Sequence, residues 1–466
     1  MLFTPTTNPS NNQSWQEIAK KEQSHRDATI SALDPPLPDI NTTNLPINVT
    51  GIPKKILTAE EVTIMELPLE VLVAKMVKEE LSATQVTKAF LRRAGLTQKL
   101  TNCITELLPT TALSYASFLD NHLHTHGTPI GPLHGLPISG KEHIGIKGMT
   151  LNAGFISWHD KTALANGHIL DILLNAEAVL YARTTQPQTL MHLETSSNFY
   201  GETVNPYNRG LTSANNGIYG LRPTSYRLPV EGLSATMMGH EQVVPVIGPL
   251  STSLEGIKLF MKTLIDAKPW IREPSLLPKK LKVAVMWDDG VVRPHPPVLR
   301  ALEMVFCDDG REETAVIDAS GEPWRPLSKF IIKANPNVKP QGLSIREVWD
   351  WMIRRDQYRT EYSALWSDVD IIMSPPLNHA KYWSYTSQWN ILDYPALISS
   401  ITKVDPDIDF ADTAYKPRNE EDKFNHELYS LKDEKVIEVF EHIQKSIGLP
   451  SAGAMWGTEL LPSASL

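Results

Sequence analysis

The sequence contains few cysteines. Cys103 and Cys307 are the two cysteines among 466 residues, too few for a disulfide framework or a four-cysteine metal site. This usage is typical of a reducing compartment, and we expect a cytoplasmic protein. Cys103, within residues 100–105, is predicted to be a small buried packing residue rather than a nucleophile.

The sequence also lacks clustered positive charge and long apolar runs. Its formal net charge is −9, and no group of Lys and Arg residues forms a basic face, which argues against binding to a nucleic-acid backbone. No apolar run approaches the roughly 20 residues needed to span a bilayer. The first residues, Met1–Asn8, have neither the basic start nor the apolar core of a signal peptide. We expect no membrane span.

The chain is predicted to have three parts. A helix from Ser14 to Ala32 ends at a proline-rich stop and is followed by a Pro/Asn-rich connector, so residues 1–54 are interpreted as a helical arm and linker. Residues 55–450 form the main domain, and residues 451–466 are expected to be a flexible tail.

Two amphipathic helices are expected near the start of the main domain. In residues 69–77 the apolar side chains fall on one face, namely Leu69, Leu72, Val73, Met76 and Val77. Ser82 begins the second helix, because Gln85 three positions later completes a capping-box pattern. In that helix the inward residues are expected to be Val86, Ala89 and Phe90, with Arg92 and Arg93 facing outward.

Three histidines alternate in the segment Asn121–Gly127, at positions 122, 124 and 126. On a strand they would share one side and could bind a metal. The segment, however, ends a predicted helix just before a glycine and has no cysteine or carboxylate nearby. A solvated helix end is the favoured interpretation.

From residue 131 to residue 222, short apolar runs alternate with helical stretches, which indicates an α/β fold. Helices are predicted at 169–175, 344–367 and 434–446, and strands at 178–182, 281–287 and 369–376.

The most informative stretch is glycine-rich and apolar, Gly131–Gly154. Within it, Leu136–Ile138 is predicted to be a short buried strand with Lys141 just beyond it. Burial disfavours the ammonium form, so a lysine placed there either finds a counter-charge or becomes a neutral base. The alternative is that Lys141 extends to solvent along the strand.

Four segments together resemble the amidase signature family, in particular fungal acetamidase-like enzymes: 131–154, 183–198, 205–209 and 216–224. The resemblance implies a mixed central β-sheet covered by helices and hydrolysis of a small-molecule carboxylic amide without a cofactor. It makes Lys141 the base of a Ser–cis-Ser–Lys triad and assigns Met191 and Ser213 to substrate binding. A homodimer is left open.

The same resemblance exposes a gap. The family pattern places both catalytic serines in a segment from Gly-Gly-Ser-Ser-Gly-Gly to Gly-Gly-Ser-Ile-Arg, which should follow residues 211–213. Here Ser213 is followed directly by Ala214, so the serines, the oxyanion glycines and a core strand are missing and the fold is expected to be incomplete. Residues 304–310 and 428–434 also look shortened.

Two functions therefore remain open, an amide hydrolase and a catalytically inactive relative that binds a partner or an amide, and a truncated gene product is a third interpretation. Other hydroxyls in the motif regions are not flanked by glycine turns that could form an oxyanion hole, namely Ser139, Ser196, Ser197 and Ser213. We expect Lys141 at a strand end, beside residues 185–191 and the Ser213–Ala214 junction, with its amine partly solvated and no serine within hydrogen-bond reach.

Overall fold

The computed structural model describes residues 13–191, 194–210, 218–237, 240–241, 243–267, 283–285, 311–325, 343–364, 371–373, 384–398, 416, 418–420 and 422–423. The helices in these ranges are α1 (Trp15–Ser31), α2 (Pro53–Ile56), α3 (Ala59–Glu66), α4 (Leu69–Val77), α5 (Ala83–Thr101), α6 (Pro109–His126), α7 (His168–Asn175), α8 (Leu254–Asp266), α10 (Arg311–Asp318), α12 (Ile345–Ala364) and α13 (Ser384–Leu392), with short 3-10 turns η1 (Ile156–Trp158) and η2 (Gln188–Leu190). The strands are β1 (Ile104–Leu107), β2 (Pro137–Lys141), β3 (Val179–Thr184), β4 (Ser196–Ser197), β5 (Gly201–Glu202), β6 (Tyr219–Arg222), β7 (Leu250–Ser251), β8 (Val283–Val285), β9 (Ile371–Met373) and β10 (Ala396–Ile398).

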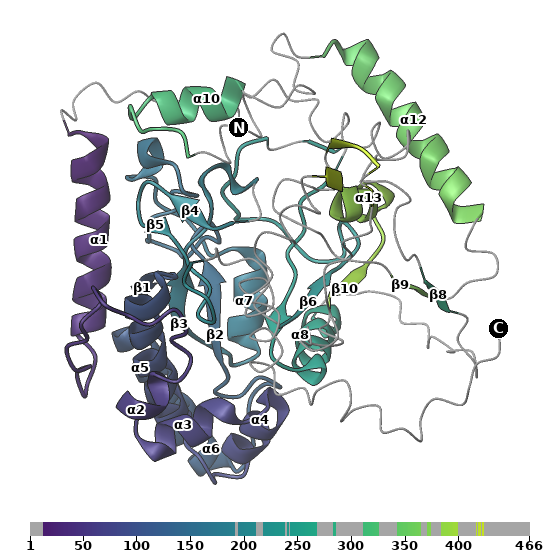
Figure 1. Cartoon of the computed structure of the whole chain (residues 1–466). Helices are drawn as coiled ribbons and strands as arrows, with labels where there is room; N and C mark the ends of the chain where they lie inside the picture. Colours follow the sequence, from purple (N-terminus) through teal and green to yellow (C-terminus); the bar gives the residue numbers. More distant parts are fainter. Residues whose placement is uncertain are drawn as a thin grey trace.

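The sheet that carries the predicted motif has the order β1-β3-β2. Strand β2 runs parallel to β3, and β1 runs antiparallel to β3, so the sheet is mixed as expected. Helix α7 connects β2 to β3. In Figure 1, helices α2 to α6 gather at one end of this sheet, and α1 lies along its β1 side.

The remaining described strands form smaller sheets. Strand β6 pairs antiparallel with both β7 and β10. Strands β8 and β9 pair in parallel, so the two segments predicted as strands at 281–287 and 369–376 are neighbours in space.

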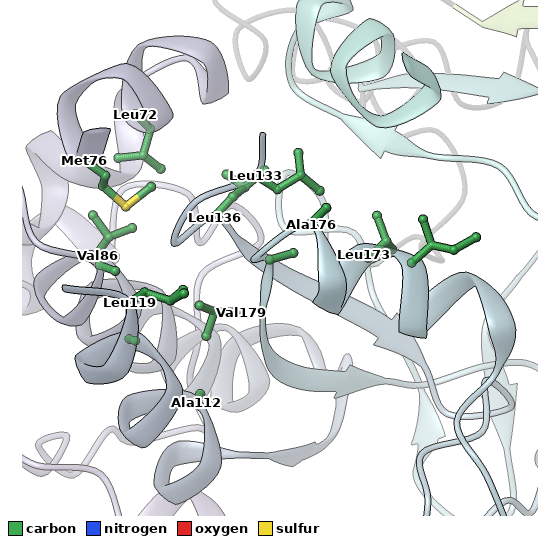
Figure 2. Packing of buried hydrophobic residues seen from close by; sticks show 14 of the residues in the cluster. Leu72, Met76, Val86, Ala112, Leu119, Leu133, Leu136, Leu173, Ala176 and Val179 are labelled. Carbon is green, nitrogen blue, oxygen red and sulfur yellow. The ribbon is translucent and has the colours of Figure 1, made fainter. Parts of the chain in front are cut away.

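The largest apolar cluster joins the helical end of the molecule to the sheet. Figure 2 shows its members converging from α4, α5, α6 and α7 onto the start of β3, namely Leu72, Met76, Val86, Ala112, Leu119, Leu133, Leu136, Leu173, Ala176 and Val179. Burying a side chain of this size stabilises the fold by about 1.5–3 kcal/mol. The predicted inward faces of the two N-terminal helices supply Leu72, Met76 and Val86 to this core.

The predicted capping box is present at the start of α5. The Ser82 side chain accepts a hydrogen bond from Gln85 N, and the Gln85 side chain accepts one from Ser82 N. A second cap was not predicted. Asp120, on α6, accepts hydrogen bonds from Ala83 N (2.6 Å) and Thr84 N (3.0 Å), the first two amides of α5.

One expected side-chain orientation is wrong. Arg92 is 6% exposed instead of facing solvent, because its Nε donates to Glu61 Oε1 at 2.5 Å and its guanidinium also donates to the carbonyl of Pro35. Arg93 is half-buried. Helical periodicity places both on the polar face, but the connector that follows α1 covers that face at Arg92.

The alternating histidines lie on the last turns of α6, which ends at Gly127 in the left-handed conformation. Helical geometry stacks the rings of His122 and His126 at 4.1 Å and leaves His124 3.4 Å from Glu79. No group of three metal-binding side chains occurs among the described residues.

The glycine-rich stretch begins where β2 must pass close to α5. Gly135 has a positive φ of 70°, and a Cβ built there would lie 2.7 Å from the Ala83 side chain. Only glycine combines that backbone conformation with that approach.

Helix α1 packs on the sheet. Ile30 and Leu33 lie in one apolar cluster with Leu91 and Ile104, and Gln23 Nε2 donates to Phe199 O at 2.6 Å.

The three-part division at residues 54 and 450 stays a prediction. Several predicted features fall outside the described residues: Ser213, Cys307, the shortened segments 304–310 and 428–434, the helix at 434–446 and the tail 451–466. No helix in the described ranges is long and apolar enough to cross a membrane.

Candidate active site

Lys141 is the last residue of β2 and lies opposite Thr184, the last residue of β3. The two strands are parallel, so the segments that follow them leave the sheet at the same edge. Glu142 N donates to Thr184 O at 3.1 Å immediately beyond the strands. The expected neighbourhood of Lys141 and the segment beginning at Thr185 is therefore present.

The Lys141 side chain is exposed, yet the protein around it desolvates the amine and lowers its pKa. Contact with water limits that desolvation. Within the described part of the chain, the Lys141 amine forms no hydrogen bond and no ion pair. The partly solvated amine predicted from the sequence agrees with this arrangement.

Glu142, the residue after Lys141, is 1% exposed. Its carboxylate accepts hydrogen bonds from Asn152 N (2.7 Å), Ala153 N (2.9 Å) and Gln186 Nε2 (2.6 Å). Burial raises the pKa of Glu142, and the charge of Arg183 and these donors oppose that shift. The carboxylate thereby fixes both the loop that follows Lys141 and the segment that follows β3.

Arg183 supplies the positive charge of this network and is 1% exposed. It donates to Glu106 Oε1 at 2.6 Å and to the backbone carbonyls of Glu142 (2.5 Å) and Thr150 (2.7 Å). Three charged groups are thus buried under the end of β2, each with a partner. These contacts fix the backbone of Glu142, the residue that follows Lys141.

His143 lies two residues beyond Lys141. Burial, and then the charge of Lys141, lower the pKa of His143 to about 3. Its backbone N donates to Gln186 Oε1 at 3.3 Å. The imidazole is therefore neutral at pH 7.

The turn η2 leads from β3 to Met191. Thr189 and Leu190 both have positive φ, 69° and 59°, a conformation that non-glycine residues adopt at a cost. Met191 follows and is half-buried. The structure places it at the end of the segment that begins beside Lys141, and its role in substrate binding stays a prediction.

None of the candidate hydroxyls within the described ranges hydrogen-bonds to Lys141. Ser139 is exposed on β2 two positions before the lysine, and Ser196 and Ser197 form the buried strand β4. The Ser197 hydroxyl accepts from Tyr200 N at 3.3 Å. Ser213 lies outside the described residues.

A serine–lysine pair does occur elsewhere. Lys161 Nζ donates to Ser234 Oγ at 2.7 Å and lies 4.0 Å from the centroid of the Trp158 ring. Contact with an aromatic face favours the charged ammonium, and Ser234 is only 2% exposed. This pair has the features of a structural contact, because neither a neutral base nor an accessible nucleophile is present.

One further buried carboxylate lies close to the turn η2. Glu322, 4% exposed, accepts from Gln188 Nε2 at 3.0 Å and from Asn198 Nδ2 at 2.7 Å. Neither Glu322 nor Glu142 was predicted from the sequence as a site residue. Glu142 could have been suspected from its place beside Lys141, whereas Glu322 lies in a segment with no motif.

Comparison with known proteins accounts for this arrangement. The profile of the Amidase family matches residues 85–215 and 212–309. A putative amidase of Schizosaccharomyces pombe is 35% identical over an alignment that covers 97% of this chain and 98% of that protein. The chain belongs to the amidase family.

Other relatives agree with the amidase assignment. Acetamidase of Emericella nidulans is 29% identical, with 94% of this chain and 99% of that protein covered. Among solved structures, a fatty acid amide hydrolase superposes with a TM-score of 0.80 at 28% identity, covering 96% and 98% of the two chains. The expected amidase signature fold, an α/β fold with mixed sheets, is confirmed.

Two details of the amidase matches concern the gap. The two profile matches meet and overlap at residues 212–215. The alignment with the S. pombe protein runs over 538 positions, although this chain has 466 residues. That relative therefore carries segments without a counterpart here.

Proposed function

We propose that this amidase-family chain retains the base of a carboxylic-amide hydrolase, Lys141, but has lost both serines of the triad and does not hydrolyse amides as it stands. The observation that carries the proposal is the Lys141 amine at the end of β2, with a lowered pKa and no hydroxyl partner in the described part of the chain. The division of the family match into two parts that overlap at residues 212–215 supports it.

The chemistry explains why a lysine alone is insufficient. In a Ser–Ser–Lys triad the neutral lysine accepts a proton from the bridging serine, which takes one from the nucleophilic serine as its oxygen attacks the amide carbonyl. The acyl group passes to that serine, the amine leaves with the returned proton, and water releases the acid. Without the serines, Lys141 has no hydroxyl to deprotonate for attack on the carbonyl carbon.

The oxyanion site would be lost with the same segment. Its backbone donors are expected in the glycines that precede the nucleophile, and removing even one such donor costs about 10²–10³ in rate. The loss of nucleophile and donors together predicts no measurable turnover.

The substrate class that the proposal assigns is a linear carboxylic amide. The relatives named acetamidase and fatty acid amide hydrolase support this class, and Met191 and Ser213 are proposed to contact the substrate. The alternative is that the chain serves as a binding protein for a partner or an amide, and the experiment below measures amide binding separately from hydrolysis.

The test measures ammonia release from acetamide, benzamide and a long-chain amide. We expect the purified chain to give the background rate. A variant with a Gly/Ser-rich family segment inserted between Ser213 and Ala214 should gain activity, and Lys141→Ala should abolish that gain. Lys147→Ala, which removes an exposed lysine from the same loop, is the matched control.

Two outcomes would decide against the proposal. Turnover by the unaltered chain that disappears with Lys141→Ala would mean that another hydroxyl serves as nucleophile. Turnover that survives Lys141→Ala in the restored chain would remove the lysine from the mechanism. Binding of benzamide to the unaltered chain without ammonia release would favour the alternative.

A further inference from the structure

Glu322 follows helix α10 and lies among hydrogen-bond donors from three other segments. Its carboxylate accepts from Ile156 N of η1 (2.9 Å), Gln188 Nε2 of η2 (3.0 Å) and Asn198 Nδ2 after β4 (2.7 Å). Ser320 Oγ of its own segment lies at 3.4 Å. A single buried carboxylate thus joins four stretches of chain.

The backbone around Glu322 is bound by the same two amides. Gln188 Nε2 and Asn198 Nδ2 also donate to Pro323 O, at 3.4 and 2.6 Å, and Arg325 N donates to Gln188 Oε1 at 2.9 Å. The Gln188 side chain therefore uses both its donor and its acceptor on residues 322–325. Gln188 and Asn198 thus bind both the Glu322 side chain and the backbone that follows it.

Apolar contacts extend the attachment to the loop after Lys141. Val316 and Ile317 of α10 are buried against Ala153 and Phe155. Ser157 Oγ donates to Val316 O at 2.5 Å. Figure 1 shows α10 at the end of the molecule toward which β4 and β5 lie.

The turn that Glu322 contacts is the strained one. Gln188 immediately precedes Thr189 and Leu190, the two consecutive residues with positive φ. Such backbone persists only where surrounding contacts determine it. The Gln188 side chain makes three hydrogen bonds to residues 322–325.

We infer that Glu322 is a positioning residue of the candidate active site, fixing the Gln188–Leu190 turn, and with it the place of Met191, from a segment 134 positions further along the chain. The inference goes beyond the proposed function, because docking of residues 311–325 does not depend on whether an amide is hydrolysed.

The charge state of Glu322 provides a specific readout. Burial raises its pKa from 4.5 to about 7, against the hydrogen bonds from Asn198, Ile156, Gln188 and Ser320 that lower it. The surrounding elements carry other ionisable groups, namely His159, Glu194, Glu202, Asp318 and Arg325. In the described part of the chain, none of these forms an ion pair with Glu322.

Docking of residues 311–325 is linked to the protonation of Glu322, and this linkage gives the direction of its pH dependence. A carboxyl whose pKa is higher when docked than when released favours docking in its protonated form. Docking is therefore strongest below pH 4.5, weakens as the pH rises through about 7, and is constant above. The docking equilibrium should change by about 10² over that range.

Hydrogen–deuterium exchange on the full chain at pH 5.5 and pH 8, expressed as protection factors, tests the inference. In the unaltered protein we expect peptides spanning 153–157 and 186–191 to lose protection at pH 8, while α5 does not. Glu322→Gln should remove this pH response. Asp318→Asn, an exposed carboxylate lost from the same segment, should keep it.

Glu322→Ala should increase exchange at 153–157 and 186–191 at both pH values by at least about tenfold. An unchanged exchange rate there in Glu322→Ala would overturn the inference. So would a pH response in Glu322→Gln equal to that of the unaltered protein, a result that remains decisive if the alanine variant fails to fold.

Discussion

The charged residues beneath Lys141 are buried together with their partners. Arg183 contacts Glu106 at 2.6 Å and Glu142 at 3.4 Å. A buried charge whose partner is removed costs far more than an exposed one, because neither water nor another group replaces the contact. We therefore expect this network to be sensitive to the loss of any of its members.

Arg183→Met should destabilise the protein by about 3–5 kcal/mol, because it leaves two buried carboxylates without their counter-charge. Urea unfolding followed by circular dichroism measures the change. The control is Lys258→Met, which removes a lysine that pairs with Glu255 at the surface and should cost less than about 1 kcal/mol. Equal losses in the two variants would show that the network does not carry this stability.

At the scale of elements, the start of α5 depends on a residue from α6. Asp120 accepts hydrogen bonds from two α5 amides and from Thr84 Oγ1 at 2.6 Å. Carboxylates are also favoured there by the helix dipole. The local capping box was predictable from Ser82 and Gln85, whereas the contribution of Asp120 required the packing of α6 on α5.

Asp120→Ala should cost about 1–2 kcal/mol, the upper half of the range for losing a helix cap, since two amides of α5 lose their acceptor. Thermal and urea unfolding give the value. Asn121→Ala, at the next and exposed position of α6, should change the stability by no more than about 0.5 kcal/mol. A smaller effect of Asp120→Ala than of its neighbour would contradict the second cap.

At the scale of the whole molecule, the proposed loss of a segment after Ser213 has a consequence for stability. A strand and helix added to the sheet would bury apolar surface at about 25 cal/mol per Å². Folded proteins are stable by only about 5–15 kcal/mol, so such a segment is large on this scale.

The chain with the Gly/Ser-rich segment restored after Ser213 should therefore unfold at a higher temperature than the unaltered chain. Differential scanning calorimetry measures the shift. The same restored chain with Lys141→Ala should keep the gain in stability while losing activity, which separates folding from catalysis. A restored chain no more stable than the original would mean that its core is complete without the segment.

The sequence by itself determined the local features: the helices at residues 15–31, 69–77 and 83–101, the strand ending at Lys141, and the family. These follow from periodicity, capping residues and motifs, which act over a few residues. The prediction that Arg92 faces solvent was wrong, because the periodicity of a helix does not indicate which distant segment covers its polar face.

Only the tertiary structure showed that Glu142, Arg183 and Glu106 form one buried network, and that Glu322 reaches the turn before Met191. Arg183 and Glu106 are 77 positions apart in the sequence, and Gln188 and Glu322 are 134 positions apart. A buried charge is stable only beside its partner. Spacing along the chain cannot indicate such pairs, because the packing of distant segments brings them together.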